Sequence, residues 1–375
     1  MMKRKRTILV AGLGRFGTAL CEQLSALSQN IVASYLVGAR FIELKTVQIL
    51  DHLDVTKPCI DMRDLGYNCE WSQELTLDES FGEYANAFIL VHALARARGA
   101  NPTGFGFNMS VGYNLEGIKS APVQLFIARM RDAARELEPR IEAVRRAFAG
   151  TSLAFSELDV PSRISNDITL STMHGCPPDE IERIGLYLIE ELGVHTTIKL
   201  NPTLLGPERL RHILHERLGH TSVEVPDEAF EHDPSFEDAA AIVESLDRAA
   251  KKAQVRFAVK LTNTLETRNI DKVLPEKEAL HYMSGRALHP LTAALAALLA
   301  QRFHGTIPLS LSGGVDAFNA ADLLACGVRP LTVSSDLLRP GGYGRLSQYL
   351  ERIAVRFDAP ETRVSTLGGG KYGVK

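Results

Sequence analysis

Eight short β-rich runs, separated by segments with helical patterns, restrict the fold of this 375-residue chain more than any other feature. Strands that alternate with helices form a parallel sheet, and eight of them fit a closed barrel. The first four runs are ILVAG (8–12), RFIELKTV (40–47), GFNMSVGY (106–113) and DITLSTM (167–173). The last four are TIKLNPTLLG (197–206), FAVKLTNTLE (257–266), IPLSLSGGVD (307–316) and PLTVSSDLLRPGG (330–342). We therefore expect an α/β fold, a (β/α)8 TIM barrel, with its chemistry at the carboxyl ends of the strands.

Helical patterns between the runs support this expectation. Residues 177–192 open with proline and acidic residues and then carry apolar residues at helical spacing, which predicts a helix. Residues 289–303 and 316–327 predict two more helices. The second should stop at Gly327, because glycine is favoured just beyond a helix C-terminus.

The domain organisation follows from these elements. We expect one barrel domain over residues 1–350 and a C-terminal extension over residues 351–375. Residues 1–30 are an atypical start, because they carry a glycine-rich segment after the first strand. Two stretches, 48–104 and 207–254, exceed what a barrel needs. Long insertions in this fold usually build lids or partner surfaces.

Composition excludes several classes of protein. The chain is 45% hydrophobic and 23% charged with a net charge of −3, so nothing electrostatic favours nucleic acid or an anionic membrane. The apolar stretch after MMKRKR is too short for a signal peptide, and the longest apolar run, 291–300, is too short for a membrane span. The five cysteines form no C-x-x-C pair, which argues against zinc or an iron–sulfur cluster held by this chain. We expect no metal site and a cytoplasmic, reduced protein.

Two strand ends predict a phosphate site. The sequence SGG at 312–314 follows a strand and exposes backbone N–H groups at close approach, and VSSD at 333–336 brings further donors beside it. The segment YMSG (282–285) accompanies them. The alternative for a lone S-G-G is a simple strand-to-helix turn.

Lysines near strand ends form a second group of candidates. Lys199 and Lys260 stand in TIKLNP and FAVKLT, where the neighbouring residues are apolar, and Lys45 has a similar setting in FIELKT. A buried lysine needs an anionic or polar partner. The alternative is a lysine in solvent at the end of a strand, which is its usual place.

Several motifs together resemble one enzyme family. They are SQNIVASYLVGARFIELKTVQILD, FNMSVGYNLEGIK, LSTMHGCPPDEIE, KLNPTLLG, KLTNTL, YMSGRALHPL, LSGGVD and DLLRPGGYGRL. Over residues 28–350 the chain is similar to the dihydroorotate/dihydropyrimidine dehydrogenase family of FMN-dependent β/α barrels. It most resembles the barrel domain of iron–sulfur/flavin subunits that carry a selenate reductase label. That label does not imply selenate chemistry for this chain, because its sequence has no molybdenum-site signature.

The resemblance implies FMN as the cofactor and assigns residues to it. Lys45 and Lys199 match lysines that approach the flavin, whose reduced form is anionic. Thr262 and Asn263 match a pair beside the substrate. The phosphate would be held by the backbone of Gly285, Gly313, Gly314, Ser334 and Ser335. Candidate substrate contacts are the asparagines of the same motifs, Asn108, Asn114, Asn201 and Asn263.

The catalytic residue departs from the dehydrogenase pattern. Those enzymes end the fourth strand with N-L-S-C-P-N and use the cysteine as a base, whereas this chain reads T-L-S-T-M-H. Cys176, slightly later, better matches the loop cysteine that acts as a general acid in dihydropyrimidine dehydrogenases. Its alternative is an inert, buried thiol. The helix dipole would lower its pKa while Asp179 and Glu180 oppose this. Lys45, Thr172 and His174 are the other catalytic candidates.

The glycine motif G-x-G-x-x-G at 12–17 also follows a strand, as a dinucleotide fingerprint does. The acid expected about 20 residues later is missing, so we favour a barrel strand over NAD binding. Cys59 and Cys69 leave open a disulfide or a ligand pair. Asn68, Glu70 and Trp71 are candidates to line a lid.

The sequence therefore predicts a flavin oxidoreductase that exchanges hydride between a small-molecule substrate and FMN. Electrons would pass to or from an iron–sulfur/FAD electron-transfer protein, because this chain has no cluster motif. The alternatives are a non-catalytic barrel scaffold of a redox complex and an NAD-binding protein. The oligomeric state stays open, including a homo-oligomer.

Overall fold

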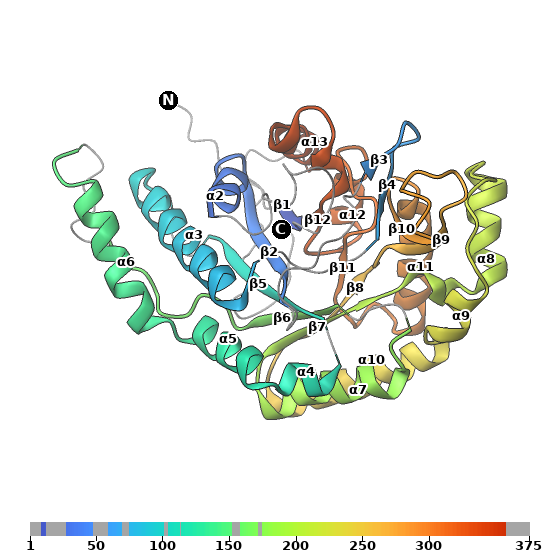
Figure 1. Cartoon of the computed structure of the whole chain (residues 1–375), viewed down its shortest axis with the longest axis horizontal. Coiled ribbons are helices and arrows are strands. Elements are labelled where there is room, and N and C mark those ends of the chain that lie inside the picture. The colour runs from blue at the N-terminus through green and yellow to red at the C-terminus, as the bar shows by residue number, and fades with distance from the viewer. Residues whose placement is uncertain are drawn as a thin grey trace.

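A closed ring of eight parallel strands forms the centre of the molecule (Figure 1). The computed structural model describes residues 9–12, 28–47, 59–69, 75–100, 104–112, 114–151, 158–171 and 175–357. The strands are β1 (Leu9–Gly12), β2 (Ala39–Val47), β5 (Gly106–Val111), β6 (Asp167–Ser171), β7 (His195–Leu200), β8 (Phe257–Leu261), β11 (Leu309–Leu311) and β12 (Thr332–Val333). Each falls within or overlaps one of the eight runs predicted from sequence.

The order of the strands closes the barrel. Neighbours follow the order β11-β8-β7-β6-β5-β2-β1-β12, and every pair is parallel. A further parallel bridge from Leu311 to Leu331 joins the two ends of this order. The (β/α)8 barrel prediction is confirmed. The strand before the 12–17 glycine motif is a barrel strand, since β1 lies between β12 and β2.

Helices surround the strands on the outside (Figure 1). The first group is α2 (Ser28–Leu36), α3 (Leu77–Ala97), α4 (Leu115–Lys119), α5 (Ala121–Arg131), α6 (Ala134–Ala147) and α7 (Pro178–Leu186), which continues as the π-helix η1 (Tyr187–Glu191). The second is η2 (Pro202–Leu205), α8 (Pro207–Arg211), η3 (His212–Arg217), α9 (Glu228–His232), α10 (Phe236–Ala253), α11 (Leu288–Arg302), α12 (Ala320–Ala325), η4 (Ser335–Leu338), η5 (Gly342–Arg345) and α13 (Leu346–Arg356).

The three predicted helices form, but one starts late. Helix α12 begins at Ala320 rather than near Asp316, because the Asp316 carboxylate accepts hydrogen bonds from the N–H groups of Phe318 and Asn319. These bonds hold residues 316–319 in a turn. Gly327, just beyond the helix, has φ = +85°, as predicted for a helix end.

The two stretches longer than a barrel needs each contain a crossover helix. Helix α3 lies between β2 and β5, and α10 lies between β7 and β8. Each begins with a capping box, Thr76 with Glu79 and Ser235 with Asp238. Such boxes satisfy the N–H groups that a helix start leaves unpaired.

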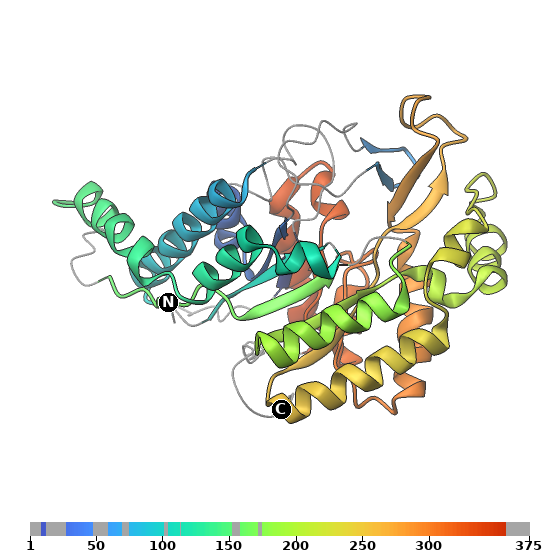
Figure 2. The same ribbon diagram turned by 60° about the horizontal axis from the view of Figure 1, so that its bottom comes forward.

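A small antiparallel sheet lies over the carboxyl-end side of the barrel. Its strands are β3 (Cys59–Ile60), β4 (Leu65–Asn68), β9 (Leu265–Arg268) and β10 (Leu280–Gly285), in the order β3-β4-β10-β9. The first two follow the end of β2 and the last two follow the end of β8. Figure 2 shows these strands together on the side that also carries α8 and η3. We call this sheet the cap sheet.

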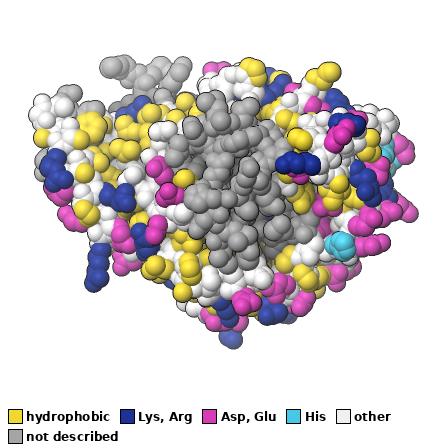
Figure 3. Space-filling model, in the orientation of Figure 1, with side chains coloured by type: hydrophobic (Ala, Val, Ile, Leu, Met, Phe, Trp, Pro, Cys, Tyr) yellow, Lys and Arg dark blue, Asp and Glu magenta, His cyan; other side chains and the backbone are white. Residues whose placement is uncertain are grey.

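The end of the described chain is part of the barrel layer. Helix α13 crosses the predicted boundary at residue 350 and buries Leu346, Tyr349 and Ile353. Acidic and basic side chains are interspersed on the face in Figure 3, without a broad area of one sign among its described atoms. Within the described residues, no helix has the length and apolar character needed to span a membrane.

Candidate functional site

A chain of polar side chains links the carboxyl ends of three neighbouring strands. It begins at Asp233, a buried carboxylate between α9 and α10. Its Oδ2 accepts hydrogen bonds from Asn201 Nδ2 at 2.9 Å and from Thr203 Oγ1 at 2.6 Å. Its Oδ1 accepts one from the backbone N–H of Gly175 at 2.9 Å. One carboxylate therefore fixes the rim after β7 and the loop after β6.

This anchor also decides how two predicted substrate contacts are oriented. A carboxylate can only accept, so Asn201 must turn its amide nitrogen toward Asp233 and its oxygen away. That oxygen accepts a hydrogen bond from Asn263 Nδ2 at 2.7 Å, and Asn263 Oδ1 faces Ser171 Oγ at 3.4 Å. The predicted Asn201 and Asn263 thus meet at one rim, with a fixed direction of donors and acceptors.

Cys176 lies beside this network, one residue after Gly175. Burial, followed by the carboxylates of Glu180, Asp179 and Asp233, raises the pKa of its thiol to about 11. Burial and acidic neighbours therefore outweigh any lowering by the helix that starts at Pro178. At neutral pH this side chain is a protonated thiol, which suits a proton donor better than a nucleophile.

The two strand-end lysines have different surroundings. Lys199 and Lys260 are register partners on β7 and β8. Lys260 is buried and forms an ion pair with Glu43 of β2, so its anionic partner belongs to the protein. Burial lowers the pKa of Lys260 to about 7 and that of Lys199 to about 8. Lys199, at the next-to-last position of β7, remains a candidate to meet a ligand at the barrel mouth.

The predicted phosphate segments surround one pocket. Gly285, Gly314, Ser334 and Ser335 all line it, although they come from three separate strand ends. Gly314 has φ = +68°, and a Cβ there would lie 2.6 Å from the backbone nitrogen of His289. Gly285 has φ = +87°, and its Cβ would strike the carbonyl oxygen of Asp64. These glycines are required for the segments to pack together around the pocket.

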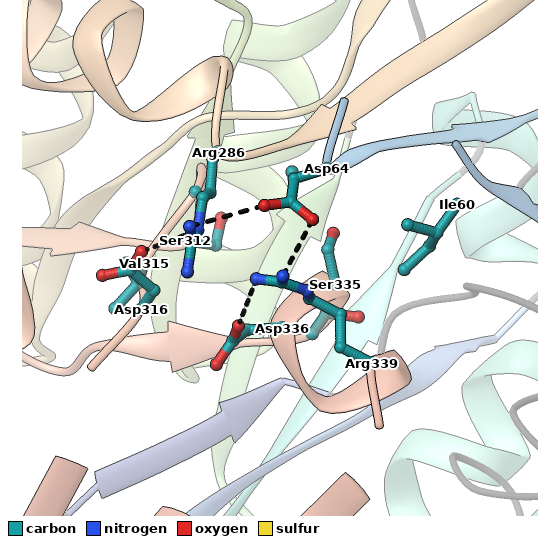
Figure 4. A pocket seen from close by; sticks show the side chains of 12 residues that line it. Ile60, Asp64, Arg286, Ser312, Val315, Asp316, Ser335, Asp336 and Arg339 are labelled. Carbon is teal, nitrogen blue, oxygen red and sulfur yellow. Dashed lines mark ion pairs between the residues drawn. The ribbon is translucent and has the colours of Figure 1, made fainter. Parts of the chain in front are cut away.

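Charged side chains complete the same pocket (Figure 4). Arg339 lies 2.9 Å from an Asp64 oxygen, and Arg286 lies 3.4 Å from the other. Asp316 and Asp336 line the opposite wall. Arg286 Nε lies 3.1 Å from an Asp316 oxygen and Arg339 Nη1 lies 3.7 Å from an Asp336 oxygen, as ion pairs without hydrogen-bond geometry. Buried guanidinium nitrogens of this kind are suited to an oxyanion.

The other predicted residues are placed as follows. Thr262 directs its hydroxyl to Thr292 of α11 at 3.0 Å, and Gly313 packs over these two hydroxyls. Asn108 lies in the barrel core and donates to Thr169 Oγ1 at 2.6 Å. Asn114 is exposed and caps α4 by accepting from the Gly117 N–H.

Some predictions fall outside the described residues. These are Thr172 and His174 of the loop after β6, the side chain of Lys45, and the lid candidates Glu70 and Trp71.

Asn68 is buried at the end of β4 in the cap sheet. Cys59 and Cys69 are free thiols, so they form no disulfide.

Sequence reasoning missed the charged members of the site. Asp233 stands in HDPS just before a helix, where an acidic residue reads as a cap. Arg286 and Arg339 lie inside motifs in which the sequence assigns the phosphate site to the glycines and serines alone. Two arginines after two strand ends were the available signal for an anion site.

Comparison with known proteins identifies the family. A family model described as "Oxidoreductase YgfK, N-terminal TIM-barrel domain" matches residues 16–367. The chain belongs to this oxidoreductase family. Its curated relatives include the protein named "Putative oxidoreductase YgfK" in Escherichia coli K12 and in Escherichia coli O157:H7. Each is 45% identical over 346 residues, which cover 87% of this chain and 33% of the relative. The chain thus spans about a third of the length of these relatives.

A solved structure supports the fold. The crystal structure of DHODH from Eimeria tenella, in complex with ferulenol, superposes with a TM-score of 0.52 at 12% sequence identity. The match covers 94% of this chain and 81% of that one. At this identity the likeness concerns the fold alone.

Proposed function

We propose that this domain is an FMN-dependent oxidoreductase barrel that exchanges hydride between a small-molecule substrate and the flavin. The observation that carries the proposal is the meeting of three strand-end segments, at Gly285, Gly314 and Ser334–Ser335, around one pocket. Family resemblance assigns these segments to the FMN phosphate. The guanidinium groups of Arg286 and Arg339, which pair with carboxylates of the pocket, suit an anionic group there.

The remaining groups divide the work at the barrel mouth. A bound flavin supplies hydride transfer, and the protein supplies binding, orientation and proton transfer. Lys199 offers a cation that favours an anionic ring. Asn201 and Asn263, oriented by Asp233, offer directed hydrogen bonds to a polar, ring-shaped substrate. The Cys176 thiol, protonated at neutral pH, would give a proton to a substrate carbon.

The length of the relatives supports a second element of the proposal. Since the chain spans about a third of them, we propose that electrons pass between this barrel and an iron–sulfur/FAD unit. The cap sheet and the α8–α9 segment are the proposed docking surface. We also propose a cytoplasmic location, in which the free thiols stay reduced.

The test is flavin binding by the purified domain, measured by absorbance and by titration with FMN. Ser335→Asp adds a carboxylate inside the pocket and should weaken FMN binding strongly. Ser347→Asp is the matched control, because Ser347 is exposed on α13 outside the pocket. Wild-type protein that binds no flavin would favour the non-catalytic scaffold. Equal FMN affinity in both variants would move the phosphate elsewhere.

A further inference from the structure

The Asp64 carboxylate lies between two arginines of the phosphate pocket. Arg339 Nη2 is 2.9 Å from one carboxylate oxygen and Arg286 Nη1 is 3.4 Å from the other. Figure 4 shows this arrangement, with Asp64 reaching from the turn between β3 and β4 toward both guanidinium groups. A carboxylate between two guanidinium groups has the charge and shape that these groups also recognise in a phosphate.

The other two carboxylates of the pocket also pair with these arginines, Asp316 with Arg286 Nε at 3.1 Å and Asp336 with Arg339 Nη1 at 3.7 Å, but each has further partners in the wall. Asp316 is buried and accepts from the N–H groups of Phe318 and Asn319. Asp336 is buried and accepts from Arg345 at 2.8 and 3.1 Å and from the Tyr349 hydroxyl at 2.7 Å. These carboxylates belong to the wall. Asp64, by contrast, has a side chain that is 30% exposed at the pocket mouth.

We propose that Arg286 and Arg339 form an oxyanion site and that Asp64 is its resident anion, which an incoming phosphate monoester displaces. The inference rests on the proposed function for the identity of that ester, the phosphate of FMN. The inference adds Arg286 and Arg339 as side chains that bind the phosphate. It also makes Asp64 the residue that sets the preference for phosphorylated over unphosphorylated flavin.

Charge makes displacement necessary. A phosphate monoester carries about −1.5 to −2 charges at pH 7, and Asp64 beside it would add a third carboxylate, after Asp316 and Asp336, against the same pair of cations. The wall carboxylates are fixed, so Asp64 is the group that can leave.

Geometry makes displacement simple. The Asp64 backbone is packed against Gly285, whose Cβ position its carbonyl oxygen fills, so the turn itself stays in place. Rotation of the partly exposed side chain into solvent removes Asp64 from both arginines and leaves each with its wall carboxylate, Asp316 or Asp336.

The test compares ligands with and without a phosphate. Asp64→Asn removes the charge and keeps the shape, and asparagine tolerates the φ of +64° at this position. FMN should bind about tenfold more tightly to Asp64→Asn than to wild type, which corresponds to ~1.4 kcal/mol, while riboflavin affinity stays unchanged. Asp64→Gly, also compatible with this φ, should behave the same way. Asp271→Asn is the control, since Asp271 pairs with Arg63 at 2.9 Å and does not line the pocket.

A second measurement is independent of flavin. Inorganic phosphate should raise the melting temperature of Asp64→Asn more than that of wild type, and adding Arg339→Gln should abolish the difference. Equal FMN-to-riboflavin affinity ratios in wild type and Asp64→Asn, or equal phosphate stabilisation, would overturn the inference. Phosphate stabilisation as expected without flavin binding would support the oxyanion site and overturn the proposed flavin function.

Discussion

Replacement of Asp233 should destabilise the domain and disorganise its rim. The carboxylate is buried and accepts hydrogen bonds from Asn201, Thr203 and the backbone of Gly175. Asp233→Ala leaves all three donors without this acceptor. Asp233→Asn keeps the volume of the side chain. However, its amide has only one acceptor oxygen, so its NH2 group must face some of the same donors.

The magnitude follows from these three bonds. A hydrogen bond to a charged group contributes about 1.5–3 kcal/mol, and the contributions of neighbouring bonds are not additive. Water entering the space left by Asp233→Ala would recover part of the loss. We therefore expect a decrease in the free energy of unfolding of about 3–5 kcal/mol for Asp233→Ala and about 1.5–3 kcal/mol for Asp233→Asn.

Urea unfolding followed by circular dichroism measures this decrease, and flavin titration of the folded variants separates stability from function. Both variants should retain FMN, because the phosphate pocket lies at other strand ends, and both should lose turnover. Asp227→Ala is the control in the same segment. Its carboxylate is mostly exposed and pairs with Arg211, so it should cost less than about 1 kcal/mol. A loss of under about 1 kcal/mol for Asp233→Ala would refute the anchoring role argued from its three bonds.

Three further predictions concern the titratable side chains. Cys176→Ala should retain flavin but slow substrate-dependent flavin reduction by about 10² to 10⁴, measured by stopped flow, and wild-type-like rates would exclude the thiol as the proton donor. Because the pKa of Lys199 lies near 8, its ammonium is charged at pH 7 and mostly neutral at pH 9. The affinity for the anionic reduced flavin should therefore fall over this range in wild type and stay low and constant in Lys199→Met; parallel pH profiles would contradict this. Lys260→Met leaves Glu43 as an uncompensated buried charge and should cost about 3–5 kcal/mol in urea unfolding, whereas Lys260→Met with Glu43→Leu should recover most of it. An equally unstable double variant would show that the pair is not the cause.

The sequence predicts the barrel well because the signal for each strand lies within a short segment of the chain. Every one of the eight β-rich runs became a barrel strand, and β-branched and apolar residues between turn signals suffice for that. The cap sheet was harder. The sequence indicates one strand over residues 257–266, yet they contain the whole of β8, a connection at 262–264 and the start of β9. Its partner strand β10 is indicated by the sequence only as a phosphate segment.

The candidate site divides in the same way. Glycines and serines after strands could be assigned from local pattern, and they do meet at one pocket. Asp233 and Glu43 could not, because what makes each important is a partner distant in sequence. Glu43 and Lys260 are 217 residues apart, and nothing near either one indicates the pairing. Prediction from one sequence finds groups whose role depends on neighbours in the chain and misses those whose role depends on closure of the barrel.

The Glu43–Lys260 pair supplies a counter-ion from within the protein to one of two neighbouring lysines. Lys199 and Lys260 are register partners on adjacent strands, about 4.8 Å apart at the backbone, and two ammonium groups so close would repel each other. Glu43 reaches Lys260 from across the core and forms an ion pair with it. Lys199 is the less buried of the two lysines and lies next to the strand end. An anion approaching the strand ends therefore meets Lys199 before Lys260, whose counter-ion is Glu43.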